Sequence, residues 1–100
     1  MRTILLVEDD EDFRHAAARH LSDAGLEVLA VPSTMTALIK VNSGRRIDAF
    51  VIDIVMPPGA PQGPSFGLLM HRRRPAAPML FITSFPRLAI GELLPGKILS

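Results

Sequence analysis

Hydrophobic positions in this chain fall into short continuous runs separated by polar segments. The mostly apolar stretches "TILLV" (residues 3–7), "EVLAV" (27–31), "AFVID" (49–53) and "MLFIT" (79–83) are rich in branched side chains. Runs of this length are typical of strands that are buried on both faces of a parallel sheet. The pattern therefore predicts four buried strands, and a fifth can start at Ile98.

Apolar residues recur at helical spacing between these runs. The first predicted helix covers residues 13–24, with an apolar face made of Phe13, Ala16, Ala17 and Leu21, and Gly25 can end it. Ser33 can cap a second helix that continues to Asn42, and a short third helix covers residues 66–73. Because strands and helices alternate, we expect an α/β fold built from parallel β-α-β units.

Composition limits the classes of protein that this sequence can represent. The chain has 100 residues, of which 48% are hydrophobic, so it can form one small domain with a core. The net charge of +1 argues against binding to nucleic acid or an anionic membrane through bulk electrostatics. There is no cysteine, no signal-peptide pattern and no run of membrane-spanning length. We expect a soluble cytoplasmic protein.

Acidic and hydroxyl side chains stand where three of the predicted strands end. Glu8 and Asp9 follow the first strand, Asp53 ends the third and Thr83 ends the fourth. Ligands bind at this edge of open α/β sheets, and clustered carboxylates there favour a divalent cation such as Mg²⁺. A carboxylate nucleophile, a cation and a hydroxyl donor together favour phosphoryl transfer to an aspartate.

A simpler interpretation exists for some of these acids. An acidic run after a strand is often the first turn of the next helix, and we prefer that interpretation for Asp10, Glu11 and Asp12. Asp53 is different, because it lies between "FVI" and "IVM", where an ionised side chain is costly without a function.

Three segments together resemble the receiver domain of two-component response regulators, the CheY-like family. They are "ILLVEDDEDFR" (4–14), "VIDIVMP" (51–57) and "LFITS" (80–84). The resemblance implies a flavodoxin-like open parallel sheet of strand order 2-1-3-4-5, and one receiver domain over residues 1–100. It also implies a phosphoacceptor switch that takes its phosphoryl group from a histidine kinase or phosphotransfer protein, with no direct contact to nucleic acid or membrane.

Site roles follow from the same resemblance. Asp53 is similar to the family's phosphoacceptor, and Thr83 to the hydroxyl residue that moves toward the phosphoryl group. Mg²⁺ would be held by Asp9 and Asp53 directly, by Glu8 through water, and by the backbone carbonyl of Val55. Such a domain promotes its own phosphorylation and slow dephosphorylation, and is not an enzyme with a separate substrate.

The sequence departs from the family pattern toward its end. The family's lysine after the fifth strand has no match, because Lys97 precedes the expected strand. The fifth helix is missing and the fourth is short, which suggests C-terminal truncation. An uncovered sheet face would favour a homodimer or strand exchange.

Two alternatives to a phosphoacceptor remain. The first is a receiver-like protein-interaction module that does not depend on phosphorylation, which the missing lysine favours. The second is a Mg²⁺-dependent phosphatase, which Val55 opposes because it occupies the place of a second carboxylate. A nucleotide-binding loop at Gly91, Gly96 and Lys97 is not expected, because Pro95 interrupts the segment and Ile98 stands where the motif has a Ser or Thr.

Overall fold

The computed structural model describes residues 1–53, 63–82 and 97–99, and these form a parallel sheet with helices on both faces. The strands are β1 (Thr3–Val7), β2 (Glu27–Val31), β3 (Ala49–Asp53), β4 (Met79–Ile82) and β5 (Lys97–Leu99). Their order is β2-β1-β3-β4-β5, which confirms the predicted topology. The helices are α1 (Glu11–Asp23), α2 (Thr34–Asn42) and α3 (Gly63–Arg73).

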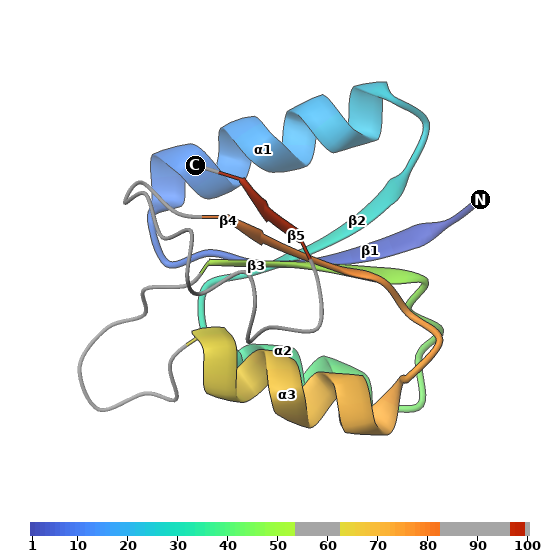
Figure 1. Ribbon diagram of the computed structural model, residues 1–100. Coiled ribbons are helices and arrows are strands. Elements are labelled where there is room, and N and C mark those ends of the chain that lie inside the picture. The colour runs from blue at the N-terminus through green and yellow to red at the C-terminus, as the bar shows by residue number, and fades with distance from the viewer. Residues whose placement is uncertain (54–62, 83–96, 100) are drawn as a thin grey trace.

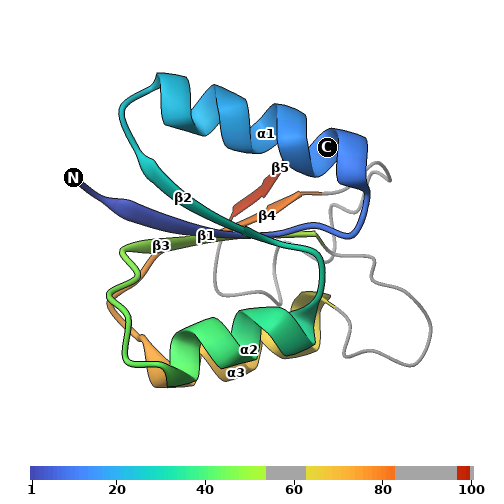
Figure 2. The same cartoon turned by 180° about the vertical axis from the view of Figure 1, so that it is seen from behind.

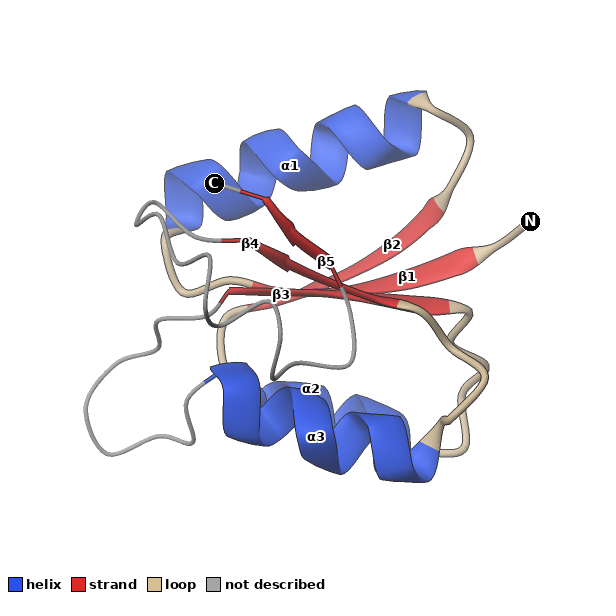
Figure 3. Cartoon of the chain, in the orientation of Figure 1, coloured by secondary structure: helices blue, strands red, loops and turns tan. Residues whose placement is uncertain are grey.

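The helices form a layer on each side of the sheet (Figure 1). Helix α1 lies on one side and helices α2 and α3 lie on the other, an arrangement that the view from behind also shows (Figure 2). Strands β1, β3 and β4 run in the same direction and end at the same edge, on the left of Figure 3. Polar residues that follow these strands are therefore brought together at one edge.

Local hydrogen bonds define where the helices begin. The side chain of Asp10 accepts a hydrogen bond from the Phe13 amide and caps α1, and Ser33 caps α2 in the same way through Thr36. Gly25 and Gly44 follow the two helices with φ of 91° and 79°, a conformation that glycine adopts without strain. Helix α3 begins at Gly63, three residues before the predicted start.

Most of the core lies between the sheet and the pair α2 and α3. Its largest fully buried side chains include Leu5, Phe50, Ile52, Met70 and Phe81. The sequence predicted four strands buried on both faces. Strand β1 is buried throughout, whereas only Val31 is buried in β2, because β2 is an edge strand. Burial of this apolar area is the main favourable term in folding.

Helix α1 covers its side of the sheet only in part. The expected apolar face is wrong in detail, because α1 has no buried residue and half of the Phe13 side chain is exposed. The helix packs mainly against the edge strand β2, so one flank of its apolar stripe faces solvent. Beside it lies an apolar cavity of about 530 Å³, lined partly by Leu21, Val51 and Leu80. The homodimer through this face stays a prediction.

A fifth strand forms near the end of the chain as predicted, but it begins one residue earlier than expected and includes Lys97. Lys97 is the first residue of β5 and pairs in register with Leu80, whereas Asp53 pairs with Ile82. The backbone of Lys97 therefore lies two register positions before the level of Asp53 in the sheet. The short fourth helix predicted after Thr83 lies outside the described residues, and so does Ser100. Among the described helices, none has the length and apolarity required to cross a bilayer.

Close packing between α3 and β4 generates a stability prediction at Gly67. A Cβ atom on this glycine would lie 2.5 Å from Cζ of Phe81, whose ring is fully buried. We expect Gly67→Ala to lower the free energy of unfolding by about 1–3 kcal/mol, although alanine normally stabilises a helix by about 0.5–1 kcal/mol relative to glycine. Urea unfolding followed by circular dichroism measures this difference.

Ser65→Ala is the matched control, because Ser65 is exposed on the same helix. This change is expected to be neutral or slightly stabilising. A Gly67→Ala protein as stable as the Ser65→Ala protein would contradict the close contact with Phe81.

Candidate functional site

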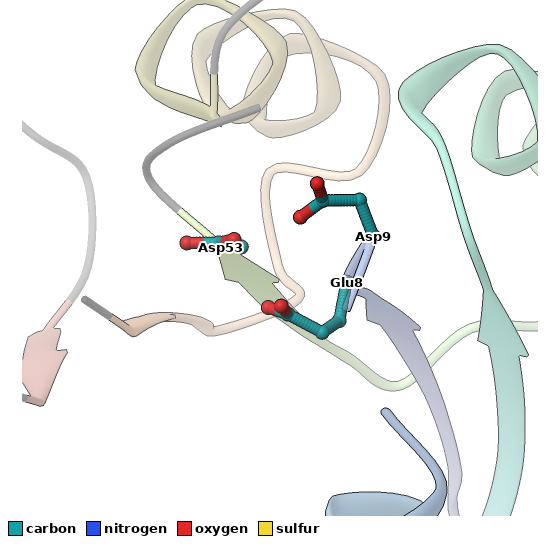
Figure 4. A group of neighbouring side chains, drawn as sticks. All are labelled: Glu8, Asp9 and Asp53. Carbon is teal, nitrogen blue, oxygen red and sulfur yellow. The ribbon is translucent and has the colours of Figure 1, made fainter. Parts of the chain in front are cut away.

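Strands β1 and β3 bring the predicted acidic residues together. The two strands are parallel neighbours, with Val7 in register with Ile52, so the residues that follow them lie side by side. Glu8, Asp9 and Asp53 each offer a carboxylate oxygen, and these oxygens lie within 4.8 Å of one another. The three side chains point toward a common space at the sheet edge (Figure 4). The predicted convergence is confirmed.

Glu8 is the buried member of this group, with 5% of its surface exposed. Its amide donates a hydrogen bond to the Val31 carbonyl oxygen at 3.1 Å, which extends the pairing of β1 and β2 by one residue. Its Oε1 accepts a hydrogen bond from the Asp10 amide at 3.2 Å. The first bond fixes the backbone of Glu8 and the second holds its carboxylate, so the side chain cannot turn out to solvent without losing the bond from Asp10.

Burial and negative neighbours change the proton affinity of Glu8. Burial, followed by the charge of Asp53, raises the pKa of Glu8 to about 7, and the Asp9 charge contributes in the same direction. The hydrogen bond from the Asp10 amide opposes this rise only in part. The site thus carries more negative charge than its surroundings readily stabilise, which is the electrostatic condition under which a cation binds.

The other two carboxylates are more accessible than Glu8. Asp9 is exposed and Asp53 is partly buried at the end of β3. An ion or a small anion can therefore approach the group from the solvent side. All three side chains offer oxygen atoms only, the donor set that Mg²⁺ prefers.

The remaining acids of the run have the simpler role that the sequence suggested. Asp10 is the N-cap of α1, and Glu11 and Asp12 lie in its first turn. Carboxylates in this position interact favourably with the positive end of the helix dipole.

Arg14 is a contact of the site to which the sequence analysis gave no role. Its Nη1 donates a hydrogen bond to the Glu8 carbonyl oxygen at 3.1 Å, from the first turns of α1. The guanidinium thereby links the helix to the segment that carries Glu8 and Asp9. Its position six residues after Glu8 gave no signal, because such a bond depends on how the chain turns between β1 and α1.

Two predicted site residues lie outside the described part of the chain. They are Val55, whose carbonyl was expected to bind the metal, and Thr83, the expected hydroxyl contact. Their roles stay predictions.

The chain matches known proteins over most of its length. Residues 4–90 match the family described as "Response regulator receiver domain". A curated relative, the sensor kinase CckA of Brucella abortus (strain 2308), is 31% identical over 95 residues. That match covers 94% of this chain but 10% of the relative, so the chain spans about a tenth of the kinase's length.

Solved structures with the same fold include response regulators from two bacteria. A receiver protein from Sinorhizobium medicae WSM419 is 29% identical, with a TM-score of 0.87, over 98% of this chain and 80% of its own. TrrA of Thermotoga maritima, solved in complex with Mg²⁺-BeF, is 21% identical with a TM-score of 0.86. The match covers 100% of this chain and 87% of TrrA. TrrA has also been solved in complex with the histidine kinase ThkA. That structure is 20% identical with a TM-score of 0.83, and the match covers 99% of this chain and 84% of the other.

The family match, the sheet order and the acidic group at the ends of β1 and β3 agree with one another. This chain belongs to the response regulator receiver domain family of two-component signalling.

Proposed function

We propose that Asp53 accepts a phosphoryl group from a histidine kinase or a phosphotransfer protein, and that the domain acts as a phosphorylation switch. One observation carries this proposal: Asp53 ends β3 with its carboxylate within 4.8 Å of those of Glu8 and Asp9. An aspartate in such a position is partly exposed to a donor while its neighbours favour a cation beside it. The family match to residues 4–90 supports the same role.

The chemistry is a displacement at phosphorus. An Oδ atom of Asp53 forms a bond to phosphorus as the bond from phosphorus to the donor's imidazole nitrogen breaks, and that nitrogen keeps the electron pair. The product is an acyl phosphate. Water later attacks the phosphorus, the bond to Asp53 breaks, and inorganic phosphate leaves while the carboxylate is restored. The domain promotes both steps on itself and has no separate substrate.

Mg²⁺ fits the residues that are present. Asp9 and Asp53 would bind it directly, Glu8 through water, and the carbonyl of Val55 would complete the protein ligands. A bound Mg²⁺ supplies positive charge that offsets the repulsion between the carboxylates and the phosphoryl oxygens. Support comes from the oxygen-only donor set and from the raised pKa of Glu8, which is caused first by burial and then by the charges of its acidic neighbours.

The relatives are consistent with this assignment of partner and cofactor. TrrA was solved with Mg²⁺-BeF and with a histidine kinase, and CckA is itself a sensor kinase. We extend these partners to this chain as part of the proposal. Thr83 would then respond to the phosphoryl group and shift a two-state equilibrium of the domain.

Asp53→Asn is expected to abolish phosphorylation, because an amide lacks the nucleophilic oxygen anion. The protein is incubated with Mg²⁺ and a small phosphodonor such as phosphoramidate, and added phosphate is measured by intact-mass spectrometry. Asp23→Asn is the control, since Asp23 is an exposed residue at the far end of α1, and it should be phosphorylated like the wild type.

Phosphate on the Asp53→Asn protein would reject Asp53 as acceptor. A wild-type protein that takes up no phosphate with this donor or with a histidine kinase would favour the phosphorylation-independent interaction module.

The raised pKa of Glu8 makes stability depend on pH in the absence of Mg²⁺. Folding raises this pKa from 4.5 to about 7, so the folded protein binds more protons between these values. The contribution to stability is complete below the lower value and is lost as pH rises through the upper one. Urea unfolding in EDTA across this range should show the free energy falling with pH, and Glu8→Gln should remove most of the slope.

Glu11→Gln is the control, because Glu11 is exposed in the first turn of α1. It should keep the wild-type slope. Added Mg²⁺ should raise the free energy of unfolding more at about pH 8 than at about pH 5, since it competes with the proton for the folded site. Equal slopes for the wild type and Glu8→Gln would refute this account of Glu8.

A further inference from the structure

Helices α2 and α3 expose large aliphatic side chains on the side of the molecule away from α1. Met35 and Ile39 of α2 are 67% and 62% exposed, and Leu69 of α3 is 39% exposed. Single exposed apolar residues are common on protein surfaces, but a contiguous group indicates an interaction site. The question is whether these residues are neighbours.

Helix geometry places the exposed residues on one stripe of each helix, and one hydrogen bond joins the two helices near their C-terminal ends. Met35, Ile39 and Asn42 are spaced i, i+4 and i+7, so they lie on one stripe of α2. Leu69 and Arg73 are spaced i and i+4 and lie on one stripe of α3. Nη1 of Arg73 donates a hydrogen bond to Oδ1 of Asn42, which joins the two stripes at their C-terminal ends.

A second contact fixes the same arrangement. Nη2 of Arg74 donates to the Val41 carbonyl oxygen at 3.2 Å, so a second arginine side chain ties the end of α3 to the backbone of α2. The helices lie on the same side of the sheet in both views (Figures 1 and 2). The α2–α3 surface consists of six exposed residues on these helices: Met35, Ile39, Asn42, Leu69, Arg72 and Arg73.

Helices α2 and α3 carry basic side chains and no acidic ones. Residues 28–47 and 63–82 contain no aspartate or glutamate, although the whole chain has ten acidic residues. Arg72 and Arg73 are exposed, and within the described residues neither forms an ion pair. The partner of Arg73 is the neutral amide of Asn42, so its charge is not cancelled. The α2–α3 surface therefore combines aliphatic side chains with uncompensated positive charge.

We propose that the α2–α3 surface binds an acidic amphipathic helix of a partner protein, with its apolar residues against Met35, Ile39 and Leu69 and its carboxylates on Arg72 and Arg73. Methionine and arginine are enriched in protein interfaces, and arginine binds carboxylates through two parallel hydrogen bonds. Helix recognition by a surface of this kind uses anchors spaced i, i+3, i+4 and i+7.

Two other partners fit the surface less well. Single-stranded nucleic acid is bound by aromatic stacking, and the α2–α3 surface has no aromatic side chain. A membrane-binding helix places its main apolar face in the lipid, whereas α2 and α3 direct theirs into the core, where Ala37, Val41, Phe66 and Met70 are buried. A protein helix needs only the smaller apolar strip that is exposed here.

The test uses a designed peptide of about 14 residues, near the length at which isolated helices become stable in water. It contains leucine at i, i+3, i+4 and i+7 and glutamate at most other positions, and a scrambled peptide of the same composition is its control. Each is titrated into ¹⁵N-labelled protein, and amide shift changes are followed by NMR. The expected changes cluster on residues 35–42 and 68–74 for the amphipathic peptide only.

Variants separate the α2–α3 surface from general charge effects. Ile39→Asp and the double change Arg72→Glu with Arg73→Glu are each expected to weaken binding by about tenfold or more. The matched controls are Ala16→Asp and Arg19→Glu, which change exposed residues of α1 on the other side of the sheet and should bind like the wild type. NMR spectra with unchanged dispersion show that each variant is folded.

Several outcomes would overturn the proposal. They are the absence of binding at about 1 mM peptide, equal binding of the scrambled peptide, and shift changes centred on α1. A fourth is tighter binding to phosphatidylserine vesicles or to an oligonucleotide, which would assign the surface to another class of partner. Phosphorylation of Asp53, measured by mass spectrometry, does not depend on any of these four outcomes. The proposed helix-binding surface and the proposed phosphoacceptor can therefore fail separately.

Discussion

Electrostatic repulsion among three carboxylates at one sheet edge is the constraint on which the functional account depends. Parallel pairing of β1 and β3 places Glu8 and Asp53 beside each other whatever their charges. Apolar burial by the strands and by α2 and α3 stabilises that pairing, while the acids oppose it locally. The pKa of Glu8 is raised first by its burial and then by the charge of Asp53, so part of this rise reflects the repulsion. A cation or a shared proton relieves it, and both couple the stability of the fold to the state of the site.

The two faces of the sheet differ in how this site is supported. On the side of α2 and α3, Val7 and Ile52 are fully buried in the core immediately before Glu8 and Asp53. These residues fix the ends of the strands. On the other side, α1 begins directly after the acidic run and is held by the Asp10 cap and by Arg14. The site thus lies between the buried core and the first turn of α1, a helix that has no buried residue.

Sequence reasoning predicted the fold well because its signals are local. Short apolar runs, the helix ends at Ser33 and Gly25 and the alternation of elements are each determined within a few residues. It did not predict how little of the apolar face of α1 is covered, where Phe13 is half exposed. Periodicity shows which residues share a helix face but not how much of that face the sheet covers. The position of α1 near the edge strand β2 leaves part of its stripe in solvent.

The same distinction separates the parts of the site that could be predicted from those that could not. Glu8, Asp9 and Asp53 were identified because strand ends meet at one edge of a parallel sheet. The hydrogen bond of Arg14 and the joined stripes of α2 and α3 depend on side-chain directions between segments distant in sequence, as the contact from Arg73 to Asn42 does. No spacing rule encodes such contacts.

Paramagnetic broadening by Mn²⁺ tests the central claim most directly, because it locates a bound divalent ion within the fold. The wild-type protein labelled with ¹⁵N is titrated with Mn²⁺, and Mg²⁺ is then added in excess. The account predicts that the amides of Glu8, Asp9 and Asp53 broaden first and that Mg²⁺ restores them. Broadening centred instead on the exposed acids Glu11 and Asp12, or spread evenly along the chain, would contradict a metal-binding carboxylate group at the ends of β1 and β3.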